Sequence, residues 1–263
     1  MNEVKKFPWI VPLYNFDSDA GLVTLHKSLR LRRVESDELE NLMAKLTRHV
    51  EPYLLLLEAK YVLEDQIGHH SMKDVHDMIV ALRMLKAGDF KILVAFHLHE
   101  GDRISLGTYG DIHKVSFSSN PYSLEKREIA DFIELWKKMQ DRTSKQHLDF
   151  PLGKFMEAYD REGFDDKIVD YMVAFESLVF HHVEGGDTQR IRTPMAIAIS
   201  MLLGNSKDER DTIRKNMQDA YDVRSAKVHG YVKKPKGRKQ DIRQVSMHVE
   251  DYLRRALRRF VEE

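Results

Sequence analysis

The chain has 263 residues, of which 42% are hydrophobic and 32% charged, and its 42 Lys and Arg residues balance 42 Asp and Glu residues. This composition is typical of a globular protein with one large domain or two smaller ones. The absence of cysteine excludes disulfides, thiol nucleophiles and cysteine-ligated metal centres. No stretch approaches the roughly 18–20 apolar residues of a membrane span, and the N-terminus does not resemble a signal peptide, so we expect a cytoplasmic protein that does not bind membranes.

The first part of the chain, residues 1–120, is predicted to be a mixed α/β region. The alternation in GLVTLHKSLRLRRV (21–34) predicts a strand or hairpin. A helix should follow in SDELENLMAKL, where Asp37 and Glu40 have the spacing of a capping box. PYLLLLEAKYVLED (52–65) fits either a strand pair or one buried strand.

Two further elements are expected before residue 120. KDVHDMIVALRMLKAG predicts a helix that ends at Gly88, and FKILVAFHLHEGDRISLGTYG (90–110) predicts two strands joined through EGD. His97 and His99 then share one face of a strand and are a possible metal pair, although no third ligand is evident.

The second part, residues 121–263, is predicted to be an all-helical bundle of about five or six helices, so the fold class is α+β. Pro194 and Gly204 bracket a helix that is apolar nearly all round and should be the most buried of this half, with Thr193 as its N-cap. Ser206 and Glu209 form a predicted capping box for the next helix, which should stop at Gly230. Helical periodicity covers residues 123–142, 149–163, 164–182, 193–204, 206–230 and 241–263.

Arg224 and His229 stand out in the helix that precedes Gly230. At 100° per residue, Arg224 falls on the apolar stripe of Ile213 and Met217, where a guanidinium needs a partner. His229 points about 140° away from Arg224 on an intact helix. Either the last turn loosens at Gly230, or a second copy of the chain completes the site. The alternative interpretation is a buried arginine ion pair and a histidine that interacts with the helix end.

Three segments resemble the Apea-like HEPN domains in their order and spacing. AYDVRSAKVHG (220–230) carries the R-x4-6-H motif of that family, and IVDYMVAFESLVF (168–180) carries a helix of the form A-x-E-x-L, in which the glutamate is Glu176. PMAIAISMLLG (194–204) lies between them. The resemblance covers roughly residues 150–262.

The resemblance implies a metal-independent endoribonuclease that needs no cofactor, often part of toxin–antitoxin or antiviral defence, in which a homodimer brings two motifs to one cleft. Arg224 and His229 would be the catalytic pair, and an antitoxin or other regulatory protein would be a further partner. Histidine suits general acid–base work, and arginine suits a phosphate on which negative charge develops. A HEPN bundle that binds nucleotide, RNA or protein without cutting is the alternative.

Three residues are expected to support this pair. Ser225 could donate to His229 or bind phosphate, or be an ordinary surface serine. Glu176 borders an apolar face and needs a partner, for which Arg224 is the candidate, and we favour a structural role for this pairing. Tyr221 is expected to lie in the core rather than to stack on a base.

The segment from Tyr221 to the C-terminus is basic, with 12 Lys and Arg residues against 6 Asp and Glu, whereas the preceding 220 residues hold 30 against 36. A basic segment of this kind suits RNA phosphates, although a solubilising linker is an equal alternative. The sequence contains no P-loop, G-x-G-x-x-G or G-x-S-x-G motif. The residues expected to bind phosphate are Lys227, Lys233, Lys234, Lys236, Arg238 and Lys239.

Overall fold

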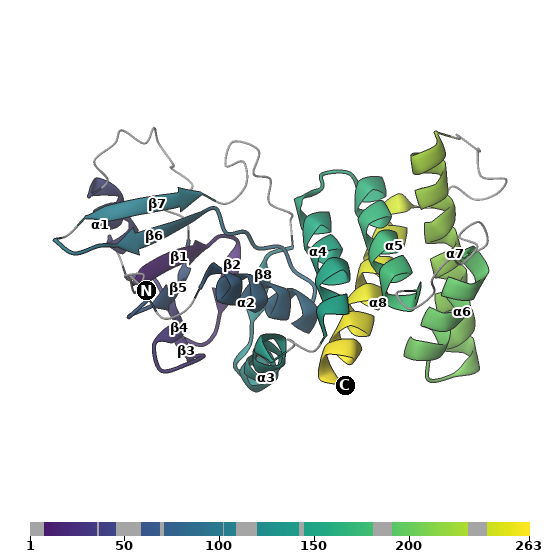
Figure 1. Ribbon diagram of the computed structural model, residues 1–263, viewed down its shortest axis with the longest axis horizontal. Helices are drawn as coiled ribbons and strands as arrows, with labels where there is room; N and C mark the ends of the chain where they lie inside the picture. Colours follow the sequence, from purple (N-terminus) through teal and green to yellow (C-terminus); the bar gives the residue numbers. More distant parts are fainter. Residues whose placement is uncertain are drawn as a thin grey trace, which may run out of the picture. The chain divides into compact units, whose positions relative to one another are not determined.

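A computed structural model describes residues 8–35, 37–45, 59–68, 71–101, 103–108, 120–141, 145–180, 191–230 and 241–263 (Figure 1). The fold is α+β, as the sequence predicts, with strands in the first half and helices in the second. The chain divides into two compact units. Unit 1 comprises residues 1–79 and 87–136, and unit 2 comprises residues 80–86 and 137–263.

Unit 1 is built around a six-stranded antiparallel sheet with the strand order β3-β4-β5-β1-β6-β7. The β3–β4 pair is the hairpin predicted from the alternation in residues 21–34. The β6–β7 pair is the second predicted pair, so both strand predictions are confirmed. The strands are β1 (Trp9–Leu13), β3 (Leu22–Thr24), β4 (Leu29–Arg33), β5 (Tyr61–Asp65), β6 (Val94–Leu98) and β7 (Ile104–Thr108).

One face of this sheet is covered by the short helix α1 (Glu38–Ala44). Leu39 and Leu42 of α1 pack with apolar side chains of the strands, among them Val62 and Phe96. The predicted capping box of α1 is wrong. Asp37 has a left-handed φ of 61°, which is incompatible with the extended conformation of an N-cap residue.

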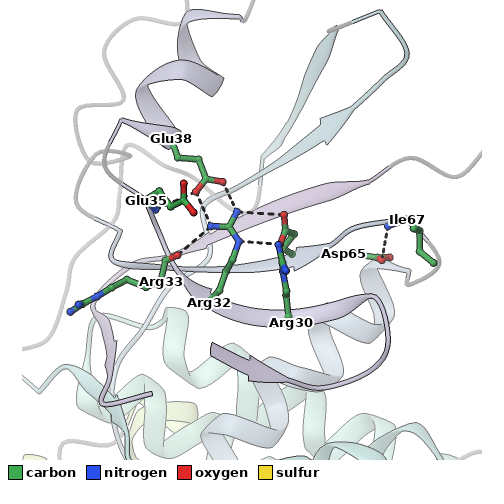
Figure 2. Close-up of polar contacts among 8 residues, drawn as sticks. Arg30, Arg32, Arg33, Glu35, Glu38, Asp65 and Ile67 are labelled. Atoms are coloured by element: carbon green, nitrogen blue, oxygen red, sulfur yellow. Dashed lines mark hydrogen bonds and ion pairs between the residues drawn. The ribbon is translucent and has the colours of Figure 1, made fainter. Parts of the chain in front are cut away.

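A cluster of ion pairs ties α1 to β4 and β5 (Figure 2). Arg32 donates to both carboxylate oxygens of Glu38, with Nη1 2.8 Å from Oε2. Its Nε donates to Glu64 at 3.0 Å, and Arg30 donates to the same carboxylate. Burial would raise the pKa of Glu64, but the hydrogen bonds from Arg32 and Arg30 outweigh it and lower the pKa. Glu38 is therefore held by the sheet, and its Oε2 also accepts from the backbone N–H of Glu35, just before α1, at 3.3 Å.

A second, parallel pair joins β2 (Phe16–Ser18) to β8 (Tyr122–Leu124), and Gly88 lies beside it. The preceding helix, α2 (Met72–Leu85), ends before Gly88. A Cβ on Gly88 would lie 2.9 Å from Cδ2 of Tyr122, and Gly88 has a φ of 157° that side chains rarely allow. The glycine is thus required by close packing as well as by backbone conformation.

We expect Gly88→Ala to lower the free energy of unfolding by about 1–3 kcal/mol, because Tyr122 is fully buried and cannot move aside without overpacking. Urea unfolding followed by circular dichroism measures this. Gly21→Ala is the control, because a Cβ there meets nothing within 4 Å. Equal stability of the two variants would contradict the packing argument.

Unit 2 is a bundle in which α5 packs against α4, α7 and α8, and α6 packs against α7 (Figure 1). The prediction that residues 193–204 form the most buried helix is wrong. Ile197 and Met201 of α6 are 45% and 57% exposed, because α6 buries only the side that faces its neighbours. The helices are α3 (Ile129–Gln140, shared with unit 1), α4 (Asp149–Glu157), α5 (Phe164–Phe180), α6 (Arg192–Leu203), α7 (Lys207–His229) and α8 (Ile242–Glu262).

A buried polar network crosses the core of unit 2. Arg254 of α8 is only 6% exposed, and its Nε donates to the backbone oxygen of Arg83 at 2.8 Å. Arg254 also donates to Glu250 one turn earlier. The Glu250 carboxylate accepts further hydrogen bonds from the hydroxyls of Tyr159 at 2.8 Å and Tyr171 at 3.2 Å. Because each of its charges is paired and hydrogen-bonded, this network can be buried.

Candidate functional site

The helix that carries the R-x4-H motif, α7, is unbroken from Lys207 to His229. The Ser206 hydroxyl accepts from the N–H of Glu209 at 3.1 Å, as predicted for the capping box. The Glu209 carboxylate accepts from the N–H of Asn205. Gly230 ends the helix in the left-handed conformation, with φ of 66°, which confirms the predicted stop.

Arg224 lies between α7 and α5, where its Nη2 donates to Oε2 of Glu176 at 3.2 Å. The two side chains are 19% and 21% exposed. The pairing expected from their positions on the two helices is thus present. Arg224 continues the buried side of α7, whose residues Ile213 and Met217 are in the core.

This ion pair leaves hydrogen-bonding capacity unused. Within the described ranges, Nε of Arg224 and Oε1 of Glu176 are both buried without a hydrogen-bond partner. Leaving such an atom unsatisfied costs about 1–3 kcal/mol, and the native exceptions are often binding or catalytic groups. The unused donor is itself buried, so a ligand would reach the guanidinium through the exposed 19% of the Arg224 side chain.

Glu176 is held in a partly dry environment. Burial raises the pKa of its carboxyl group, and Arg224 opposes that change without cancelling it. The Glu176 carboxyl group is consequently easier to protonate than a solvated glutamate, although Arg224 stabilises its charged form.

His229 is exposed and is the last residue of α7. Because the helix is regular up to this residue, no loosened last turn brings the imidazole back towards Arg224. The side chains of Arg224 and His229 leave the helix about 140° apart. A single chain therefore presents them on different sides of α7.

The three remaining described residues of the predicted site lie on α7 within three positions of Arg224 in the sequence. Tyr221 and Ser225 are partly buried, and the Tyr221 ring centroid lies 5.9 Å from Cζ of Arg224. Lys227 is exposed, and its Nζ pairs with Asp165 at 2.7 Å and with Asp166 at 3.1 Å. The other residues expected to bind phosphate lie outside the described residues: Lys233, Lys234, Lys236, Arg238 and Lys239.

Sequence reasoning missed the carboxylates that neutralise this end of α7. Asp165 and Asp166 begin α5, where acidic residues are ordinary for the first turn of a helix. On α7 itself, Asp222 is neutralised by Arg192 of α6, from which it accepts two 2.8 Å hydrogen bonds. Only the packing of α5 and α6 against α7 brings these charges together.

Of the predicted histidine pair, His97 lies on β6 and His99 follows the end of that strand. Nε2 of His99 is 2.7 Å from the Ser105 hydroxyl of the neighbouring strand. Burial and the nearby His99 lower the pKa of His97 below its ordinary value of 6.5. Among the described residues, no group of three or more His, Cys, Asp or Glu side chains could hold a metal ion.

We expect His97 to make unit 1 less stable in mild acid. A histidine whose pKa is lowered in the folded state favours folding while it is neutral, and this contribution is lost as the pH falls from 6.5 through the folded pKa. His97→Gln should remove part of the decrease in melting temperature between pH 7 and pH 5. The control is His248→Gln on the exposed side of α8. An equal acid dependence in His97→Gln and the unsubstituted protein would contradict this.

No described helix is long and apolar enough to cross a membrane. No family model, curated protein or solved structure matches this chain. Inference about function therefore depends on the motif, its helix and the ion pairs around it.

Proposed function

We propose that the protein is a metal-independent endoribonuclease of the HEPN type, acting in the cytoplasm. The observation that carries the proposal is the arrangement around Arg224. A guanidinium on the packing side of α7 is held by Glu176 of the A-x-E-x-L helix and keeps an unused donor, five residues before an exposed histidine at the helix end. These are the residues on which the resemblance to HEPN domains depends.

The chemistry requires few groups, because RNA supplies its own nucleophile. The 2′-hydroxyl attacks the adjacent phosphorus while His229 accepts its proton, and His229 then gives this proton to the departing 5′-oxygen, which is general acid–base catalysis. Arg224 stabilises the negative charge that develops on the phosphate oxygens. The 5′-oxygen leaves, and the products are a 2′,3′-cyclic phosphate and a 5′-hydroxyl.

A homodimer supplies the geometry that one helix lacks. Since Arg224 and His229 point about 140° apart on α7, Arg224 of one copy acts with His229 of another. Such enzymes suit toxin–antitoxin or antiviral defence, in which an antitoxin or other regulatory protein restrains cleavage. We include this role and this partner in the proposal.

A non-catalytic binding module is the second candidate. It is favoured by the limited exposure of Arg224, at 19%, and by its ion pair with Glu176, since both features are equally suited to holding α5 against α7. On that account, Arg224→Ala would destabilise the fold, and the unsubstituted protein would leave diverse RNAs intact.

The proposal is tested by incubating the purified protein with mixed-sequence RNA in EDTA. We expect cleavage to fragments that end in 2′,3′-cyclic phosphate, identified by mass spectrometry. RNA with 2′-O-methyl groups should be resistant, because its nucleophile is blocked. Intact RNA under all conditions, with the chain folded and dimeric, would leave the binding module as the better account.

A further inference from the structure

Near the end of α7, two described cations form ion pairs with carboxylates of α5. RNA would have to displace these carboxylates in order to bind the cations. Lys227 is paired with Asp165 and Asp166, at 2.7 and 3.1 Å. Arg224 is paired with Glu176 at 3.2 Å. Three carboxylates thus meet two cations, so this cluster carries one excess negative charge when all five groups are ionised.

A negative cluster opposes the approach of a phosphate backbone. Asp165 and Asp166 belong to the first turn of α5, and the Lys227 side chain reaches them from the last turn of α7. The hydrogen bond from Lys227 lowers the pKa of Asp165 and so favours its charged form. Without those two carboxylates, Lys227 would offer an unneutralised cation at the helix end that carries His229.

The aspartate–lysine contacts are exposed, and such contacts are weak. The side chains of Lys227, Asp165 and Asp166 are each between 37% and 46% exposed. Exposed ion pairs contribute little to stability and are screened by salt, so an RNA phosphate can replace them. The competition should therefore change affinity without preventing binding.

We propose that Asp165 and Asp166 are affinity-determining residues of the RNA site, which compete with a backbone phosphate for Lys227. This inference rests on the proposed ribonuclease function. An RNA phosphate binds Lys227 only by displacing the carboxylates of the two aspartates, and this displacement costs part of the binding free energy. The two aspartates lower the affinity for short or weakly bound strands, and their effect is greatest at low salt.

The test measures binding of a fluorescently labelled, single-stranded 2′-O-methyl RNA, which cannot be cleaved through the 2′-hydroxyl. We expect Asp165→Asn with Asp166→Asn to tighten binding roughly two- to five-fold at low salt. The slope of log affinity against log salt should steepen by up to about 0.7, the value for one phosphate contact, because that contact no longer has to replace two carboxylates. Adding Lys227→Ala to the double variant should remove both gains.

A matched control separates local competition from overall charge. Asp208→Asn with Asp211→Asn removes two exposed carboxylates from the start of α7, one of them paired with Arg214, and changes the net charge equally. If both double variants give the same affinity and slope while the protein cleaves RNA, the competition is refuted and the ribonuclease proposal stands. If the unsubstituted protein neither cleaves nor binds RNA, the proposed function fails and this inference fails with it.

Discussion

Replacing His229 by alanine should lower RNA cleavage in EDTA by about 10²–10⁴-fold, the range for loss of a general acid–base group. Arg224→Ala should lower it by about 10²–10³-fold, because the charge on the phosphate is no longer stabilised. His229 is exposed at the end of α7, so its removal should leave the melting temperature nearly unchanged. The measurement is the initial rate of cleavage of a labelled RNA.

The matched controls are His248→Ala and Arg214→Ala. His248 is an exposed histidine on α8, and Arg214 is a half-exposed arginine on α7 that pairs with Asp211. Neither control should change the rate. Full cleavage by His229→Ala, or an equal loss in His248→Ala, would remove His229 from the mechanism.

Replacing Arg254 by alanine should destabilise unit 2 by about 3–5 kcal/mol, because it removes a buried cation and leaves the partly buried Glu250 charge unpaired. Arg254 is almost fully buried and donates to both Glu250 and the backbone oxygen of Arg83. The expected result is a large decrease in the urea concentration at the unfolding midpoint. Tyr159 and Tyr171 also donate to Glu250, so their side chains should shift when the Glu250 carboxylate loses Arg254.

A double-mutant cycle tests whether the loss comes from the unpaired charge. Arg254→Met combined with Glu250→Leu removes both charges and keeps apolar volume, so it should be less destabilising than the sum of the single changes. Arg259→Ala, an exposed arginine on the same helix, is the control. Additive effects of Arg254→Met and Glu250→Leu would mean that the two charges do not depend on each other.

Features that depend on local chemistry could be predicted from the sequence. The two strand pairs follow from alternating apolar residues, and the helix stop at Gly230 follows from the ease with which glycine adopts a positive φ. The pairing of Arg224 with Glu176 could also be anticipated, because both charges border apolar helix faces and need a partner.

Features that depend on packing between distant segments could not be predicted from the sequence. A helix that is apolar all round, such as α6, does not indicate which side will be covered, so the exposure of Ile197 and Met201 was missed. Arg254 lies in the sequence RRALRR, which suggests a solvated surface, yet it is the buried member of that run. Asp37 has the spacing of a capping residue, but its left-handed backbone conformation, which the sequence does not reveal, excludes that role.

We propose that α7 carries half of a ribonuclease site which a second copy completes. Cleavage by an equimolar mixture of the Arg224→Ala and His229→Ala proteins, after exchange of subunits, tests it most directly. Mixed dimers contain one site with an intact arginine from one copy and an intact histidine from the other. We predict that the mixture cleaves RNA far faster than either variant does alone. A mixture as inactive as its two components would contradict a site shared between copies.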